Sequence, residues 1–167
     1  MAKLDKKGTI LGVTAYADNT LVAEDVTLSL PEIVFKTQTY SALGDVELPL
    51  PLTDAIEASI TKIGFDKGLI NLLKPEKRKI EYRWAQSVIK KDGTQETEGC
   101  KAFITGIPKT IPGGDLAVGE NWEGAIPFAV TRYQLYVNGA EKILIDKLKG
   151  QIKIDGKDYA KGISSLL

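Results

Sequence analysis

The strongest constraint on this chain is an alternation of apolar and polar residues with a period of two, which recurs along most of its length. Successive side chains of a β-strand point to opposite faces, so this pattern is typical of strands with one buried face. Two dipeptides, Asp92-Gly93 and Asn138-Gly139, tolerate the positive φ angles of tight hairpin turns. At 167 residues the chain has the usual size of one domain. We predict a mainly β protein whose single domain spans residues 1–167.

Individual strands are expected where the alternation is clearest. Residues 22–30 are predicted to form one strand that ends or bends at Pro31, because proline removes a donor from the ladder. Further strands are expected at residues 33–37, 56–61 and 152–154. These segments account for the strands that precede and follow the two long hairpins.

The two turn dipeptides predict long hairpins, and a two-residue loop fixes the cross-strand partners in each. The predicted pairs are Tyr82 with Phe103 and Trp84 with Lys101 in the first hairpin, and Tyr133 with Leu144 in the second.

The strand that enters the second hairpin changes phase near Thr131. Ile126, Phe128 and Val130 share one face, whereas Tyr133 and the apolar residues after it fall on the other. Either a bulge re-aims the strand, or the strand passes from one packing environment into another, such as a neighbouring subunit.

One short helix is expected between the strands. Asp66 is a favourable N-cap residue, and Pro75 ends the helical pattern. An apolar stripe at helical spacing lies between them and must be buried, most simply as a lid over one end of a sheet. The stripe consists of Leu69, Ile70, Leu72 and Leu73.

Composition removes most classes of enzyme. The chain has no histidine and a single cysteine, Cys100, so histidine-dependent nucleophiles and histidine-bearing zinc sites are impossible. The glycines at Gly114 and Gly119 have the spacing of a phosphate loop, but Glu120 and Asn121 stand where Lys and Ser or Thr are needed. We predict a protein that is not an enzyme and takes no cofactor, metal or small-molecule substrate.

Charge is balanced overall but uneven along the chain. There are 22 basic and 22 acidic side chains, so no net charge attracts nucleic acid. Residues 18–57 hold eight acids and one lysine, whereas residues 74–91 hold seven basic residues and two acids. These segments are either ordinary solvated faces or unlike poles that meet head to tail. Residues 1–7 carry charges where a secretory signal needs an apolar core, so we expect a soluble protein folded in the cytoplasm.

Two competing functions are open at this level. Glu96 and Glu98 would share one side of a strand, as paired catalytic carboxylates do, although neighbouring acids on an exposed hairpin are usually solvated. Tyr82, Trp84 and Trp122 offer a sugar-stacking platform for a carbohydrate-binding β-sandwich, although aromatic residues on strands are more often core or interface.

The segment from Tyr40 to Thr53 is an apolar stretch stiffened by two prolines. Loops normally face water, so an extended loop this apolar suggests an arm lying on another subunit. The alternative is an internal strand with a proline at its end.

Several short motifs, taken in order, resemble the major tail tube protein of contractile-tailed bacteriophages. The resemblance runs along most of the chain and is weakest from Ile107 to Asn121. The motifs are Val26–Pro31, Tyr40–Gly44, Tyr133–Gly139 with Ile145-Asp146, and Asp155–Asp158 with the leucine-rich end.

This resemblance implies an antiparallel β-sandwich or distorted barrel with one short flanking helix. It implies hexameric rings, stacked as the inner tail tube, in which long hairpins join an inter-subunit barrel around a channel. The implied partners are other copies, the tail sheath, the tape-measure protein, the baseplate and tail-terminator proteins, and double-stranded DNA in passage without specific binding. The implied location is the virion tail, after assembly in the host cytoplasm. A phage-derived contractile bacteriocin would use the same tube without DNA cargo.

Three groups of residues are the candidate sites within this interpretation. Acids could face the channel, because a DNA conduit should not hold phosphate. The inter-ring arm candidates are Tyr40, Leu43, Leu48, Leu50 and Leu52; the subunit-joint hairpin candidates are Tyr133, Leu135, Val137 and Leu144; the lumen-facing acids are Glu96 and Glu98.

Overall fold

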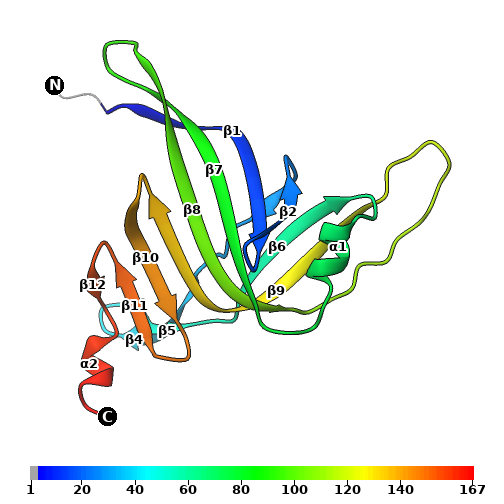
Figure 1. Ribbon diagram of the computed structural model, residues 1–167. Helices are drawn as coiled ribbons and strands as arrows, with labels where there is room; N and C mark the ends of the chain where they lie inside the picture. The colour runs from blue at the N-terminus through cyan, green and yellow to red at the C-terminus, as the bar shows by residue number, and fades with distance from the viewer. Residues whose placement is uncertain (1–3) are drawn as a thin grey trace.

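The computed structural model describes residues 4–167, in which antiparallel strands predominate (Figure 1). The strands are β1 (Lys6–Ala17), β2 (Thr20–Glu24), β3 (Leu28–Ser29), β4 (Phe35–Ser41), β5 (Asp45–Thr53), β6 (Ile56–Ile63), β7 (Arg78–Ile89), β8 (Gln95–Pro108), β9 (Glu123–Val137), β10 (Ala140–Asp146), β11 (Gln151–Ile154) and β12 (Lys157–Asp158). The helices are α1 (Lys67–Leu72) and α2 (Lys161–Ser164).

The strands form two separate sheets. The larger sheet runs in the order β12-β11-β10-β9-β8-β7-β1-β2, with β6 paired to β9 and β3 paired to β6. It curves strongly but stays open: within residues 4–167, β12, β2 and β3 each pair with a strand on one side only. β4 and β5 form a sheet of their own. The predicted mainly antiparallel β fold is confirmed, and the short helix α2 is an addition that the sequence pattern did not predict.

The core is one cluster on the covered face of the curved sheet. Side chains from β7 and β8 pack against side chains from β6, β9 and α1 in one continuous cluster. Tyr82 is fully buried there and donates its hydroxyl to the carbonyl of Ser59 at 3.0 Å. The largest fully buried side chains are Tyr82, Phe128, Ile60, Leu69, Leu72, Ile80, Ile104 and Ile126.

The predicted strand at residues 22–30 is wrong as a single element. The backbone turns at Asp25, whose φ is 50°, and the chain forms β2 before this residue and β3 after it. β2 pairs with β1, and β3 pairs with β6. β1 itself was not predicted, since Gly8 and Gly12 interrupt its apolar pattern.

The predicted helix is confirmed in position and in its cap. Asp66 has an extended backbone, and its Oδ1 accepts the N–H of Leu69 at 2.7 Å. Leu69 and Leu72 are buried, whereas Ile70 is exposed. The helix lies against β2 so closely that a Cβ on Gly68 would collide with the carbonyl of Val22.

Both predicted hairpins form, but their registers differ from the prediction by one residue. In the first, Tyr82 pairs with Ala102 and Trp84 with Cys100. The loop has three residues, because Lys90 and Thr94 are joined by a backbone hydrogen bond and Gly93 takes a φ of 87°. A type I turn followed by a left-handed glycine produces this longer loop.

In the second hairpin, Asn138 and Gly139 form the predicted two-residue turn, with φ angles of 51° and 80°. A bulge between Glu141 and Ile143 then shifts the pairing. Tyr133 therefore pairs with Ile145, and the predicted pairing of Tyr133 with Leu144 is wrong.

The phase change of β9 has both of the expected causes within a single subunit. Thr131 is bulged, because Thr105 pairs with Arg132 and the next residue, Gly106, pairs with Val130. At the same point β9 exchanges β6 for β10 as its second neighbour. The bulge thus lets one long strand pair with β6 along its first part and with β10 along its second part.

Candidate assembly surface

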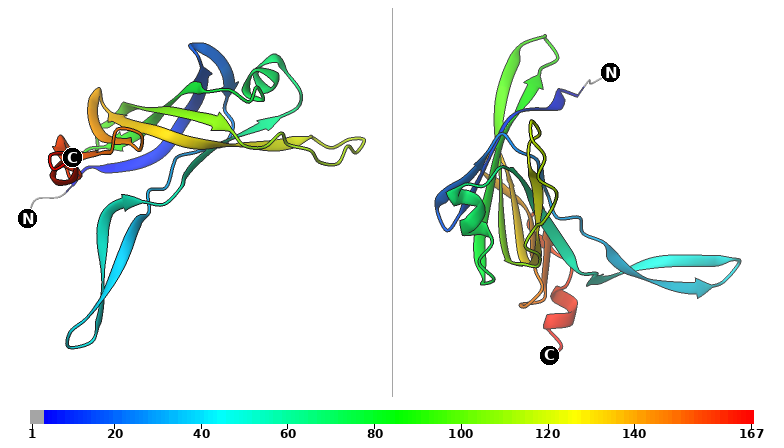
Figure 2. Two further views of the ribbon diagram at one scale, coloured as in Figure 1. Left: turned by 90° about the horizontal axis from the view of Figure 1, so that it is seen from below. Right: turned by 90° about the vertical axis from the view of Figure 1, so that its right-hand side faces the viewer.

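The β4–β5 hairpin, residues 35–53, is a largely exposed element that we call the arm. It makes no ladder with the main sheet and extends away from the body of the subunit (Figure 2). No residue in this range is buried. The segment is neither the extended loop nor the internal strand that the sequence suggested.

The arm has two chemically different faces. Tyr40 pairs with Val46, and Gln38 pairs with Leu48, so these side chains share one face. The opposite face carries the pairs Thr39 with Glu47 and Ser41 with Asp45. The first is the apolar face of the arm, and the second is its acidic face.

The arm candidates from the sequence occupy three positions. Tyr40 and Leu48 lie on the apolar face, and Leu43 is fully exposed at the turn. Leu50 is half-buried and Leu52 is 51% exposed near the base. Val46 also lies on the apolar face but was not among the predicted arm residues. Its alternation with Leu48 in the sequence could have indicated it.

The subunit-joint candidates do not lie on one surface. Tyr133, which pairs with Ile145, is buried in the core with Leu135 packed beside it, whereas Leu144 pairs with Gln134 and faces the other side of the sheet. Leu144 is also buried within the subunit. Burial in the core raises the pKa of the Tyr133 hydroxyl to about 12. Val137 remains half-exposed at the end of β9.

The two acid candidates lie on β8 near the turn of the β7–β8 hairpin, where each pairs with a lysine. Oε1 of Glu96 lies 2.9 Å from Nζ of Lys90, and Oε2 of Glu98 lies 2.8 Å from Nζ of Lys7. The hydrogen bond from Lys7 lowers the pKa of the Glu98 carboxyl below its usual value. Each acid forms an ion pair with a lysine, and the lowered pKa of Glu98 is the opposite of the raised pKa that a catalytic acid needs.

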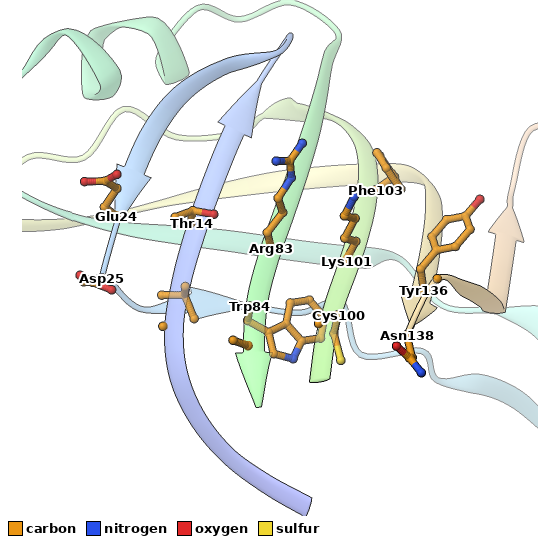
Figure 3. Close-up of a pocket in the computed structure, with 15 residues that line it drawn as sticks. Thr14, Glu24, Asp25, Arg83, Trp84, Cys100, Lys101, Phe103, Tyr136 and Asn138 are labelled. Atoms are coloured by element: carbon orange, nitrogen blue, oxygen red, sulfur yellow. The ribbon is translucent and has the colours of Figure 1, made fainter. Parts of the chain in front are cut away.

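A depression of about 990 Å³ lies across β1, β7, β8 and the end of β9 (Figure 3). Arg83 and Lys101 are cross-strand partners in it, and Tyr136 follows on β9. The Arg83 guanidinium already pairs with Glu81 at 2.6 Å and stacks 4.4 Å above the ring of Tyr16. Its charge is therefore largely occupied within the subunit.

The side chains singled out for other functions are dispersed. Tyr82 is fully buried and Trp122 is only 9% exposed, so they do not form an exposed sugar-stacking platform with Trp84. Cys100 is buried as a small apolar residue. Within residues 4–167, no group of three or more acidic, cysteine or histidine side chains is arranged to hold a metal ion. None of the helices in the same range is long and apolar enough to cross a membrane.

A second projection, the long loop at residues 109–122, was not recognised as a candidate surface. Trp122 anchors its base by stacking on Phe65, with ring centroids 4.2 Å apart, and by donating Nε1–H to the carbonyl of Gly113 at 3.1 Å. Beyond this anchor Leu116 and Val118 are 81% and 106% exposed. Exposed apolar residues on a loop rich in proline and glycine were the feature of the sequence that could have indicated this surface.

Fold and surface together define the class: a mainly antiparallel β protein whose sheet has open edges and whose apolar side chains are presented on projections. Within that class, the sequence profile of the family described as phage tail tube protein FII matches residues 7–167, and the chain belongs to this family. Its role is accordingly that of a structural component of a phage-type tail tube, as the sequence motifs predicted.

No curated protein matches the sequence. A chain in the solved structure titled "Cryo-EM structure of the anti-feeding prophage (AFP) baseplate, 6-fold symmetrised" is similar at a TM-score of 0.47 and 7% identity, over 81% of this chain and 97% of that one.

Proposed function

We propose that this protein self-assembles into hexameric rings that stack as the inner tube of a contractile tail, without catalysing a reaction. The tube surrounds the tape-measure protein during assembly, conducts double-stranded DNA, and is driven through the cell envelope by the sheath. Baseplate and terminator proteins lie at the two ends of the tube. The subunit is assembled in the host cytoplasm and resides in the virion tail.

The observation that carries this proposal is the arm. An isolated two-stranded hairpin is marginally stable in water, because it has no third strand or helix on which to bury a face. The arm pairs with no strand of the main sheet, and Phe35 at its base packs against the core, yet farther out Tyr40, Val46 and Leu48 line one of its faces. A family of tube proteins supplies the natural cover, which is another copy in the neighbouring ring.

The open sheet supports ring formation in a similar way. The first half of β1 has β7 on one side and no partner on the other, and β12 ends the sheet at its far side. Exposed strand edges invite pairing with other chains, and closure of six subunits into one barrel would remove them. We assign the joint to the β9–β10 hairpin, chiefly Val137 and Leu135, because Tyr133 and Leu144 are already covered within the subunit.

We assign Glu96 and Glu98 to the surface past which DNA travels. Each lysine that contacts phosphate adds affinity through counterion release, and strong affinity would oppose sliding. Here Lys7 and Lys90 are each held by an acid, so the end of the β7–β8 hairpin offers no unmatched ammonium from these pairs. Lysine substitution of Glu96 and Glu98 should slow DNA ejection from complete particles; lysines lining the bore in an assembled structure would contradict the assignment.

The test of assembly is electron microscopy of concentrated purified protein. The wild-type protein should form tubes whose end views have six-fold symmetry. Leu48→Glu places a charge on the apolar face of the arm and should abolish long tubes, whereas Thr39→Glu, the matched control, places the same charge on the acidic face. Circular dichroism and the unfolding midpoint should be unchanged in both variants, since the arm is outside the core. Long tubes from Leu48→Glu, or end views with another symmetry, would contradict the proposal.

A further inference from the structure

A second apolar depression lies at the base of the arm, where the arm meets the C-terminal end of the chain. We call it the basal groove; its volume is about 450 Å³. Leu148 and Leu167 are 79% and 102% exposed at its wall, and Ile163 of α2 is 43% exposed. An exposed apolar groove of this kind indicates a binding surface. Its apolar lining includes Pro51, Leu52, Leu148, Ile152, Ile163 and Leu167.

The charged residues that line the groove are three lysines and one buried acid, Asp146. Lys36, Lys147 and Lys149 all line the groove. Nζ of Lys147 donates to the carbonyls of Thr53 and Asp54, at 3.3 and 2.9 Å, and so ties the β10–β11 turn to the base of the arm. The groove therefore lies where the β10–β11 turn is hydrogen-bonded to the base of the arm, and it has an apolar centre and a basic rim.

The outer part of the arm has the complementary composition. Residues 37–53 contain Asp45 and Glu47 and no basic residue. The turn residue Leu43 is fully exposed, and Tyr40 and Val46 lie beside it on the apolar face. Interfaces combine an apolar centre with complementary charges at the rim. The arm tip has apolar side chains that match the centre of the groove and acids that match its lysines.

We propose that the arm tip of one copy docks in the basal groove of a second copy. The proposal rests on the assembly proposed above and names the receptor for the arm. A copy cannot fill its own groove, because the tip points away from the body while the groove lies at the opposite end of the same hairpin (Figure 2). Strands of seven and nine residues separate the two, a span of roughly 25 Å at the usual rise of a strand.

This contact has a consequence for assembly. A tip that binds a different surface on the next copy is a heterologous contact, which repeats from copy to copy and generates a ring or an open helical stack. The larger depression over β7 and β8 is a poorer receptor for the acidic tip, because its Arg83 is already paired with Glu81.

The test is disulfide crosslinking between copies. The double variant Leu43→Cys/Leu148→Cys places one thiol at the tip and one in the groove of every copy, so oxidation should link copies into a ladder on a non-reducing gel. The matched control is Leu43→Cys/Val118→Cys, whose second thiol is equally exposed but lies on the long loop. A wild-type sample that retains only Cys100 reports the background, since this thiol is buried.

The expected result is a ladder at least fivefold stronger with Leu148→Cys than with Val118→Cys. Equal or weaker crosslinking would overturn the docking proposal, whether or not tubes form. Failure of the wild-type protein to form tubes bears instead on the proposed function, because the crosslink is read from the gel independently of microscopy.

A charge exchange gives a second readout that needs no thiol. Glu47→Lys and Lys149→Glu should each raise the protein concentration required for assembly by about fivefold, as expected for loss of one exposed ion pair. Combining the two substitutions should restore the wild-type concentration. Two single defects that simply add in the double variant would contradict contact between tip and groove.

Discussion

Nζ of Lys62 lies 2.8 Å from Oδ2 of Asp66, and it donates a second hydrogen bond to the carbonyl of Val22, also at 2.8 Å. The Lys62 side chain is 6% exposed, so its charge depends on these partners. Since Asp66 also caps α1, the same contact joins β6, β2 and the start of the helix. It fixes the end of the sheet that carries the helical lid.

Removal of the Asp66 carboxylate should destabilise the fold. Asp66→Ala loses the helix cap, worth about 1 kcal/mol, and leaves a buried ammonium with fewer partners. Because Asp66 is 54% exposed, we expect a total loss of only about 1 to 3 kcal/mol in the free energy of unfolding by urea. Asp66→Asn keeps a capping oxygen and should lose less. A loss with Asp66→Ala no greater than with Asp66→Asn would contradict a capping role.

The same carboxylate should make stability depend on pH. The hydrogen bond from Lys62, followed by that from the Leu69 N–H, lowers the pKa of Asp66 below its ordinary value of 3.8. Its contribution is therefore fully present above that value and is lost as the pH falls through the lower folded-state pKa. The stability difference between wild type and Asp66→Asn should be constant above about pH 5 and shrink in more acidic solution. A difference independent of pH would refute the charge interaction.

Two glycine substitutions should have opposite signs. Gly68→Ala adds a Cβ that collides with the carbonyl of Val22, so α1 must move from β2, at a cost of about 1 to 3 kcal/mol. Gly162→Ala lies in α2, where the added Cβ has no neighbour within 4 Å. It should stabilise by up to about 1 kcal/mol through helix propensity. Thermal unfolding of the two variants measures both effects, and equal shifts would show that the approach of α1 to β2 is not tight.

The bulge at Thr131 should be indispensable. Deletion of Thr131 removes the residue that reconciles the two apolar phases of β9, so either Ile126, Phe128 and Val130 or Tyr133 and its neighbours must leave the core. We expect loss of cooperative unfolding. Deletion of Ala117, an equally small change in the long loop, should leave the unfolding midpoint close to that of the wild type. Comparable midpoints for the two deletions would refute the importance of the bulge.

The sequence predicted local caps and turns but missed the irregularities that shift strand pairing. The cap at Asp66 and the turn at Asn138 are local, and both are found as expected. The hairpin registers were wrong by one because Gly93 closes a three-residue loop and a bulge follows Glu141. The feature of the sequence that could have indicated the correct register is Ile145, which lies opposite Tyr133 once the bulge is included.

The candidate surface was predictable in composition but not in shape. Proline and leucine in residues 40–53 indicated an apolar segment for another subunit, yet alternation alone cannot say whether a strand joins a sheet or leaves it. β4 and β5 pair only with each other, whereas the next strand, β6, joins the main sheet through β9, sixty or more residues away along the chain. Likewise, the basal groove unites the arm base with the C-terminal helix, a contact that no local pattern encodes.

Trp122 should control the order of the long loop without taking part in its outward contacts. Trp122→Ala removes the stacking on Phe65 and the hydrogen bond to Gly113, and we expect a loss of about 3 kcal/mol or more together with rapid thermolysin cleavage near Leu116. Trp122→Phe keeps an aromatic ring but loses the hydrogen bond and the packing of the outer indole ring, so its cost should lie between about 1 kcal/mol and the cost of Trp122→Ala.

The exposed end of the loop provides the converse variant. Leu116→Ala combined with Val118→Ala should leave the free energy of unfolding within about 0.5 kcal/mol of the wild type, because both side chains are exposed. If these residues contact another copy, this variant should assemble poorly while Trp122→Phe assembles normally. Equal cleavage of the loop in Trp122→Ala and wild type would show that the anchor does not order it, whereas normal tubes from the double alanine variant would exclude the loop tip from assembly. The two measurements thus separate what holds the loop in the subunit from what the loop binds.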